Sequence, residues 1–224
     1  MDKQIAINNL DIVITNIEKA RLKVSDHHIV QLVAISKYSQ SEDINILYQS
    51  GQRAFGENKM QDLKLKSNTL NELPLSWHFV GSLQKNKINN LIDLNPTLCH
   101  SLDSLELAQE LDKKLMVKNK KMNCLLQINS AKEDSKSGVM PEVAVDIYNQ
   151  IISSCPNINL KGVMSIGAHS TDKKDIKESF DKTYEIYKQC PNATICSMGM
   201  SGDYELAIEC GSNMVRIGSA LFKS

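Results

Sequence analysis

The chain has 224 residues, of which 42% are hydrophobic and 23% charged, a mixture typical of one folded domain rather than a disordered or fibrous chain. Lys plus Arg and Asp plus Glu both number 26, so the formal net charge is zero and provides no positive field for nucleic acid or an anionic membrane. The apolar run at 29–36 is interrupted by Gln31 and falls far short of the roughly 20 residues that span a bilayer. We therefore expect no nucleic-acid partner and no membrane span.

The six cysteines occur without a CxxC motif and without the paired Cys/His spacing of a zinc site. Several of them lie inside apolar runs, where a free thiol behaves as a small hydrophobic group in a reducing compartment. The N-terminal segment carries an early acidic residue, Asp2, and lacks the apolar run of a secretory signal. We expect a cytoplasmic protein with no metal site.

Strand-like and helix-like segments follow one another along the chain. Residues 3–24 place apolar side chains at helical spacing and predict an amphipathic helix that opens the fold. Between later segments, Ser39 and Glu42 predict a helix-capping box with Gly51 as the stop, and Pro141 suits the first turn of another helix. Short β-branched runs predict eight strands, at 29–36, 53–57, 77–81, 97–102, 123–129, 160–167, 194–199 and 214–222.

This alternation, without a Pro/Gly/Ser-rich linker or a low-complexity tract, predicts one α/β domain with a parallel sheet. About eight strand-helix units in a chain near the usual barrel length of roughly 250 residues favour a closed (β/α)8 TIM-type barrel with an extra N-terminal helix. A Rossmann-like open sheet is the alternative, although no G-x-G-x-x-G follows the first expected strand.

The active site of such a barrel lies at the carboxyl ends of its strands. Lys37 follows the first expected strand and, by alternation, shares a face with Val33 and Ile35. A lysine beside an apolar core loses solvation as an ammonium, and its amine then becomes a nucleophile that forms a Schiff base with a carbonyl. The alternative is a strand-end lysine that simply extends into water.

Two small-residue turns follow the seventh and eighth expected strands, at 198–203 and 216–219. Barrels commonly bind phosphate here through backbone N–H groups, so Ser201, Gly218 and Ser219 are candidate phosphate ligands. Arg216 shares a strand face with Gly218 inside an apolar run, and a charge there needs a partner. That partner is either an acidic side chain in the barrel or a ring nitrogen of the ligand.

The stretches that carry these residues resemble a known family. They are VAISK at 33–37, FGENKMQ at 55–61, WHFVGSLQKNK at 77–87, INSAKEDSKSG at 128–138, LKGVMSIGA at 160–168 and SMGMSGDYELAIECGSNMVRIGSALF at 197–222. In these stretches the chain resembles the YggS-like pyridoxal phosphate homeostasis proteins, also called PROSC, which look like the barrel domain of alanine racemase standing alone. The last stretch is highly specific.

The resemblance implies that residues 1–224 form a single domain that binds pyridoxal 5'-phosphate (PLP) as an aldimine on Lys37. It also implies phosphate contacts from the small-residue turns, a position for Arg216 facing the pyridine nitrogen, and neighbours at the barrel mouth. The cofactor-binding set is Lys37, Asn58, His78, Ser201, Arg216, Gly218 and Ser219. Two departures are Ser219 and Tyr38, where many relatives have Thr.

The same resemblance bears on whether the chain is an enzyme. Arg216 would keep the ring nitrogen unprotonated and make it a poor electron sink, and the second base of alanine racemase comes from a C-terminal β domain that we expect to be absent after Ser224. We therefore expect a monomeric, non-catalytic carrier that buffers PLP and delivers it to apo PLP-enzymes. The alternatives are a small PLP-dependent amino-acid racemase or lyase, and a Schiff-base aldolase that acts on a phosphorylated sugar.

Overall fold

Eight parallel strands close into a barrel in the computed structural model, which describes residues 2–223. Each strand pairs with its neighbour in sequence, and β8 closes the ring onto β1 with Val33 opposite Arg216. The strands are β1 Gln31–Ile35, β2 Ala54–Glu57, β3 Ser76–Phe79, β4 Leu98–Leu102, β5 Met122–Ile128, β6 Ile158–Ser165, β7 Ile195–Ser197 and β8 Met214–Ile217. The predicted (β/α)8 barrel is confirmed, and the Rossmann alternative is wrong.

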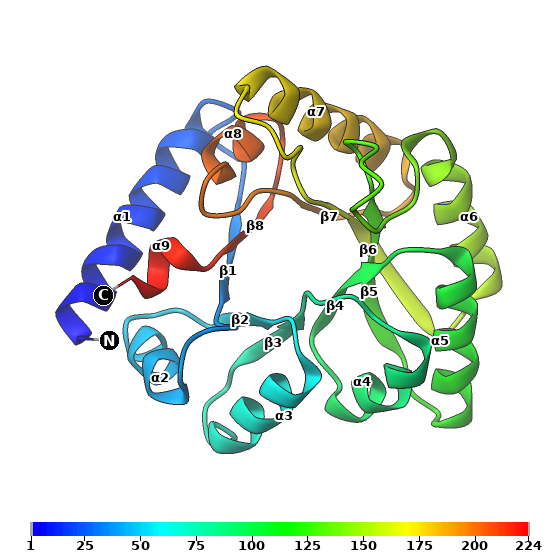
Figure 1. Cartoon of the computed structure of the whole chain (residues 1–224), viewed down its shortest axis with the longest axis horizontal. Coiled ribbons are helices and arrows are strands. Elements are labelled where there is room, and N and C mark those ends of the chain that lie inside the picture. The colour runs from blue at the N-terminus through cyan, green and yellow to red at the C-terminus, as the bar shows by residue number, and fades with distance from the viewer. Residues whose placement is uncertain (1, 224) are drawn as a thin grey trace.

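The helices surround the barrel (Figure 1). They are α1 Lys3–Leu22, α2 Ser41–Gln49, α3 Met60–Thr69, α4 Ile88–Leu94, α5 Leu105–Val117, α6 Ala144–Ser154, α7 Lys173–Gln189, α8 Tyr204–Glu209 and α9 Ser219–Phe222, with 3-10 turns η1 Lys85–Lys87 and η2 Pro141–Val143. Within residues 2–223, none of these helices combines the length and apolar character needed to cross a membrane.

The extra helix α1 covers the seam of the barrel, beside α8 and α9 (Figure 1). Asp2 caps it, because its carboxylate accepts the backbone N–H of Gln4 at 2.8 Å. Its buried stripe has helical spacing, as predicted, and consists of Ala6, Leu10, Val13, Ile17 and Ala20. The amide of Asn9 donates to the carbonyls of Leu221 at 3.2 Å and Lys223 at 3.0 Å, so α1 is tied to the C-terminal end of the described chain.

Several predicted boundaries shift by one or two residues, and two other features need correction. The capping box of α2 lies one residue later than expected, with the Asp43 carboxylate accepting the Gln40 N–H at 3.0 Å. A turn precedes it, in which the Ser39 N–H donates to the Ser36 carbonyl, and this turn lengthens the connection after β1. The last strand ends at Ile217 rather than at residue 222. Gly218 leaves the extended conformation, and residues 219–222 form the helix α9.

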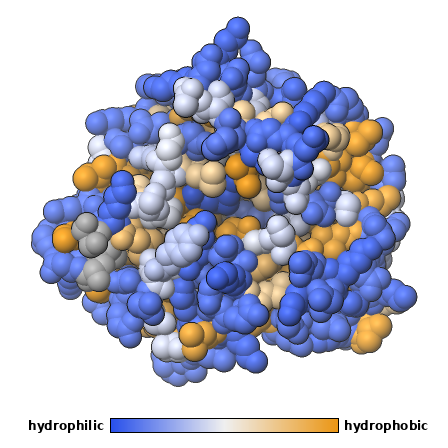
Figure 2. Space-filling view, in the orientation of Figure 1, coloured by the Kyte–Doolittle hydropathy of each residue, from blue (hydrophilic) through white to orange (hydrophobic). Residues whose placement is uncertain are grey.

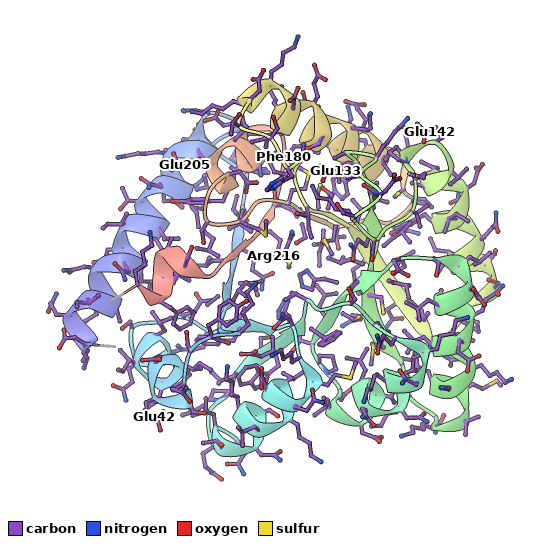
Figure 3. All side chains as sticks on the ribbon, viewed as in Figure 1. Glu42, Glu133, Glu142, Phe180, Glu205 and Arg216 are labelled. Atoms are coloured by element: carbon purple, nitrogen blue, oxygen red, sulfur yellow. The ribbon has the colours of Figure 1, made fainter. Side chains whose placement is uncertain are left out.

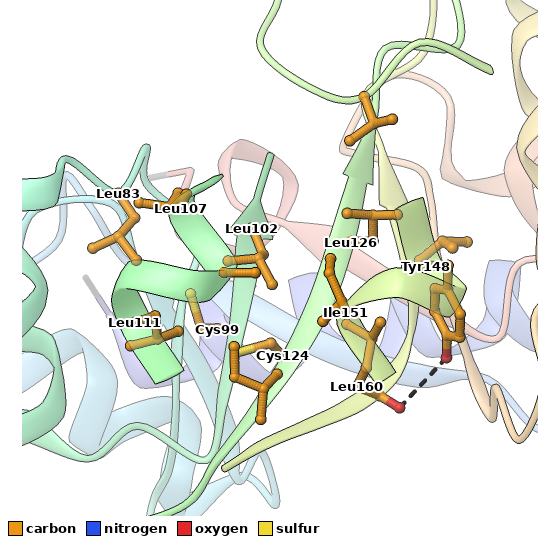
Figure 4. Packing of buried hydrophobic residues seen from close by; sticks show 14 of the residues in the cluster. Leu83, Cys99, Leu102, Leu107, Leu111, Cys124, Leu126, Tyr148, Ile151 and Leu160 are labelled. Atoms are coloured by element: carbon orange, nitrogen blue, oxygen red, sulfur yellow. Dashed lines mark hydrogen bonds between the residues drawn. The ribbon is translucent and has the colours of Figure 1, made fainter. Parts of the chain in front are cut away.

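The main core lies between the strands and the outer helices. Figure 4 shows part of it, where Cys99 and Leu102 of β4 face Leu111 of α5. A smaller apolar cluster, with Val33, Leu98, Met164 and Met214 among its members, fills the inside of the barrel. All six cysteines are buried free thiols.

Candidate cofactor site

A cavity of about 760 Å³ opens where the carboxyl ends of several strands meet. Six of the seven predicted site residues line it, namely Lys37, Asn58, Ser201, Arg216, Gly218 and Ser219. In the orientation of Figure 1, the surface is hollowed near the middle of the barrel, with polar groups around the rim (Figure 2). The barrel closure therefore gathers residues from both ends of the chain into one pocket.

Lys37 lines this cavity but is exposed, and its Nζ lies 5.0 Å from the centre of the Tyr38 ring. The expectation that strand alternation holds this lysine against an apolar core is wrong. The reason is that β1 ends at Ile35, so Lys37 belongs to the following turn and no longer follows the pleat. Its amine is accessible to a ligand in the cavity.

The residue before Lys37 is held by a buried ion pair that the sequence analysis missed. Lys66 of α3 donates its Nζ protons to the Ser36 carbonyl and to Glu57 Oε1, both at 2.7 Å. The Ser36 hydroxyl donates to the same carboxylate oxygen at 2.6 Å. The side chains of Lys66 and Glu57 are only 9% and 0% exposed. These contacts fix the backbone that carries Lys37 between β2 and α3.

The two small-residue turns are joined through Ser201. Its Oγ accepts the backbone N–H of Gly218 at 3.2 Å and of Ala220 at 3.4 Å, so its own proton is left to donate elsewhere. The N–H groups of Ser201, Gly202 and Ser219 have no acceptor in the hydrogen bonds of residues 2–223. Convergent N–H groups and hydroxyls without acceptors fit a phosphate in this cavity.

Asn58 and Gly81 bring the ends of β2 and β3 together at the rim of the cavity. A Cβ on Gly81 would lie 2.0 Å from the backbone oxygen of Asn58, far inside contact distance. Only a glycine at position 81 allows this approach. Asn58 is therefore at the cavity edge, and its backbone packs closely against Gly81.

Arg216 is buried, with 5% of its surface exposed, and lies near the middle of the barrel (Figure 3). Its Nη1 donates to the Ser197 carbonyl at 2.9 Å and hydroxyl at 2.7 Å, and its Nη2 donates to the Ser165 carbonyl at 2.8 Å. No carboxylate pairs with it within residues 2–223, so the alternative of a structural ion pair is not the arrangement found.

The charge and free donors of Arg216 remain available to a ligand. Burial lowers its pKa to about 10, against the opposing field of Asp203, so the guanidinium stays charged at neutral pH. Of its five N–H groups, the three hydrogen bonds to Ser197 and Ser165 use three. Two N–H groups are left for a ligand in the cavity that Arg216 lines.

His78, the seventh predicted site residue, does not line the cavity. Its ring is buried, with 2% exposed, and its Nδ1 lies 2.9 Å from Nε2 of His100. Nδ1 of His100 lies 3.4 Å from the Ser197 hydroxyl. Burial lowers the pKa of His78 to about 4 and that of His100 well below its usual value, with the charge of Arg216 adding to the effect on His100. The expected neighbour at the barrel mouth is thus part of a neutral pair inside the barrel.

Acid should destabilise the protein through this pair. The unfolded pKa of histidine is about 6.5 and that of folded His78 about 4, so the unfolded chain binds more protons between these values and the stability present above pH 6.5 is lost as the pH falls. For His78 alone the loss at pH 4.5 is on the order of 2 kcal/mol. Urea unfolding at pH 7 and 4.5 should show a smaller difference for His78→Phe than for the wild type. An identical pH dependence in both proteins would contradict this prediction.

Comparison with known proteins agrees with this fold. The family model described as "Alanine racemase, N-terminal domain" matches residues 8–224. A pyridoxal phosphate homeostasis protein of Helicobacter pylori is 55% identical over 214 residues, which cover 96% of each chain. The chain therefore belongs to the alanine racemase N-terminal domain family and, within it, to the pyridoxal phosphate homeostasis proteins.

Two solved structures place the fold within this family. PipY of Synechococcus elongatus, solved with PLP bound, has a TM-score of 0.79 and 29% identity and covers 97% of this chain and 99% of its own. An alanine racemase of Clostridium difficile has a TM-score of 0.74 at 16% identity, and the match covers 96% of this chain but 56% of the racemase. The second likeness concerns the barrel alone.

Proposed function

We propose that this protein binds pyridoxal 5'-phosphate in the cavity and serves to buffer and deliver that cofactor inside the cell. The observation that carries the proposal is the joint placement of an accessible lysine amine, a carboxylate-free guanidinium and N–H groups without acceptors around one cavity. The PLP-bound PipY structure and the homeostasis proteins among its relatives support the same ligand.

Each lining residue then has a role that follows from its chemistry. When bound, PLP supplies an aldehyde that condenses with an amine, a phosphate dianion and a ring nitrogen. Lys37 provides the amine. Ser201 and Ser219 hold the phosphate through hydroxyl and backbone N–H groups, and Gly218, whose N–H donates to Ser201 Oγ, gives the phosphate room at the turn. Arg216 directs its remaining N–H groups to the ring nitrogen. Asn58 borders the ligand from the end of β2.

The alternative of an amino-acid racemase or lyase requires a second group that moves a proton at the α-carbon. Besides Lys37 and Arg216, the ionisable side chains that line the cavity are Tyr38 and Lys223. Tyr38 is 86% exposed and makes its described ring contact with Lys37 itself. We therefore favour a carrier over an enzyme, with Tyr38 the base to examine first if turnover is found.

Incubation with L-alanine in deuterated water separates the two functions. Abstraction of the α-proton leaves deuterium at that carbon even when net racemisation is small. We expect deuterium incorporation no faster than with free PLP at the same concentration, together with transfer of PLP from the loaded protein to an added apo-enzyme. Rapid, stereospecific incorporation that is lost in Lys37→Ala would establish an enzyme instead.

The third alternative, a Schiff-base aldolase without a cofactor, is tested by colour. A protein that holds PLP through Lys37 should be yellow when mixed with the cofactor and should bleach with borohydride. A colourless protein that is labelled by borohydride only in the presence of a phosphorylated sugar would overturn the proposed function in favour of the aldolase.

Ser201→Ala combined with Ser219→Ala should weaken PLP binding without abolishing it. Each hydroxyl lost from a charged phosphate costs about 1.5 to 3 kcal/mol, whereas the backbone N–H groups of the two turns remain in place. Spectral titration with PLP measures the change. Ser39→Ala, in a different turn that lines the same cavity, is the control, and an unchanged affinity in the double variant would remove the phosphate from these turns.

We further propose a monomer in the cytoplasm whose partners are apo PLP-enzymes. Six buried free thiols support a reducing compartment. Sedimentation of the purified protein and PLP-transfer assays with several apo-enzymes test the two finer claims.

A further inference from the structure

A chain of buried polar groups runs beneath the cavity from β3 to β8. It connects His78, His100, Ser197 and Arg216, all of them at most 5% exposed. The successive contacts are His78 Nδ1 to His100 Nε2 at 2.9 Å, His100 Nδ1 to Ser197 Oγ at 3.4 Å, and Arg216 Nη1 to Ser197 Oγ at 2.7 Å. Only Arg216, its last member, lines the cavity.

The donors and acceptors available to each group determine which atom donates in each of these hydrogen bonds. A guanidinium has donors only, so Ser197 Oγ must accept from Arg216. The single hydroxyl proton of Ser197 then has one possible acceptor among residues 2–223, Nδ1 of His100. Nδ1 of His100 is therefore unprotonated. His100 carries its proton on Nε2, which donates a hydrogen bond to Nδ1 of His78.

The reverse assignment is less favourable for two reasons. It would direct an N–H of His100 toward the same oxygen that already accepts from Arg216, and the hydroxyl proton of Ser197 would then be buried without an acceptor, which costs about 1 to 3 kcal/mol. It would also turn a positive N–H edge rather than a lone pair toward a cation. In the assigned direction the sole unpaired group of the chain is Nε2 of His78, which lacks a partner within residues 2–223.

We propose that His100, acting through Ser197, is a positioning residue that holds the Arg216 guanidinium toward the ring nitrogen of PLP. This inference rests on the proposed function. The neutral imidazole accepts the hydrogen bond that the Ser197 hydroxyl donates, and the Ser197 oxygen is thereby oriented to accept from Arg216. Every acceptor of Arg216 is then uncharged, so the guanidinium is held in place while its charge remains available to the ligand. A carboxylate in the same place would neutralise it.

Ser165 provides a matched control. Ser165 and Ser197 are both fully buried, and the carbonyls of both accept from Arg216. Only Ser197 also uses its hydroxyl for Arg216, whereas the Ser165 hydroxyl accepts from Thr183 Oγ1 at 2.8 Å. Ser197→Ala and Ser165→Ala thus remove the same atom from the same depth, and only the first should disturb the guanidinium.

The test compares binding of PLP with binding of an analogue in which C–H replaces the ring nitrogen. We expect the wild type and Ser165→Ala to prefer PLP to a similar degree, and Ser197→Ala and His100→Phe to lose that preference by about tenfold, the effect of one hydrogen bond to a charged group. A loss of the preference in neither variant, or in Ser165→Ala to the same degree, would overturn the proposal. A general loss of stability would weaken both ligands alike and leave the ratio unchanged.

A second measurement needs no ligand and no variant. Nitrogen-15 NMR of the imidazoles in the wild-type protein should show Nδ1 of His100 unprotonated and Nε2 protonated, and a protonated Nδ1 would overturn the assigned direction. The outcomes also separate this inference from the proposed function. A wild type that fails to bind PLP contradicts the function, whereas one that binds PLP and its analogue equally contradicts the inference and the role given to Arg216 but not the binding of PLP.

Discussion

Lys37→Ala should abolish covalent attachment of PLP while the barrel stays folded. The side chain is exposed and follows the end of β1, so its removal opens no cavity in the core. In the proposed function the amine of Lys37 condenses with the aldehyde, with loss of water, to give a bond that borohydride reduces. Reduction followed by mass spectrometry should find the ligand on Lys37 in the wild type and no modification of the variant at the same PLP concentration.

Two further variants test whether the loss of covalent attachment in Lys37→Ala reflects the missing amine. Lys37→Arg keeps the positive charge but lacks the nucleophilic amine, so it should also remain unlabelled. Lys136→Ala should be labelled like the wild type, because the Nζ of Lys136 already donates to Glu133 Oε1 at 2.8 Å and to the Gly167 carbonyl at 2.7 Å. Labelling of Lys136 in Lys37→Ala at unchanged affinity would show that Lys37 is not the attachment site.

Lys66→Met should reduce the free energy of unfolding by about 3 to 5 kcal/mol, the cost of leaving one member of a buried ion pair alone. Glu57 is fully buried, and its Oε2 has no partner within residues 2–223. Without Lys66, the Ser36 hydroxyl would be the remaining partner of the carboxylate. Urea unfolding measures the loss. Because the Ser36 carbonyl also loses the Lys66 donor and keeps only the Ser39 N–H, PLP titration should show weaker binding in the cavity that Lys37 lines.

The matched change on the surface is Lys177→Met. Lys177 also pairs with a carboxylate, that of Asp181 at 2.6 Å, but both side chains are about half exposed, so we expect little change in stability. Glu57→Gln combined with Lys66→Met removes both charges and should recover part of the loss. Equal stabilities of Lys66→Met and Lys177→Met would contradict the assignment of a buried, stabilising pair.

The strands and the cavity residues at their ends could be predicted because both depend on local pattern. The β-branched runs mark the strands, and parallel strands in a closed ring bring their carboxyl ends together wherever they lie in sequence. The errors arose where a short turn interrupts the pattern, as it does after Ile35. There the alternation stops two residues before Lys37, and the inferred burial of that lysine fails with it.

The buried polar contacts were beyond prediction because they depend on which side chains meet across the barrel. Nothing local links His78 with His100, or Arg216 with Ser197, since each pair joins different strands. The sequence does contain a signal for Lys66, because this lysine continues the helical stripe of Met60 and Leu63. A lysine on an apolar stripe implies a buried partner. The identity of that partner required the structure.

The closure of β8 onto β1 has a consequence for when, during synthesis and folding, the protein can bind its ligand. Lys37 follows the first strand of the ring and Arg216 lies on the last, so the pocket is complete only after all eight strands have been synthesised and the ring has closed. Contacts between such distant segments form late and slowly, and a ligand that binds only the closed form stabilises it by mass action. A ligand in the pocket thus links the first and last strands of the ring. A nascent or partly opened barrel lacks the complete site and should not bind it.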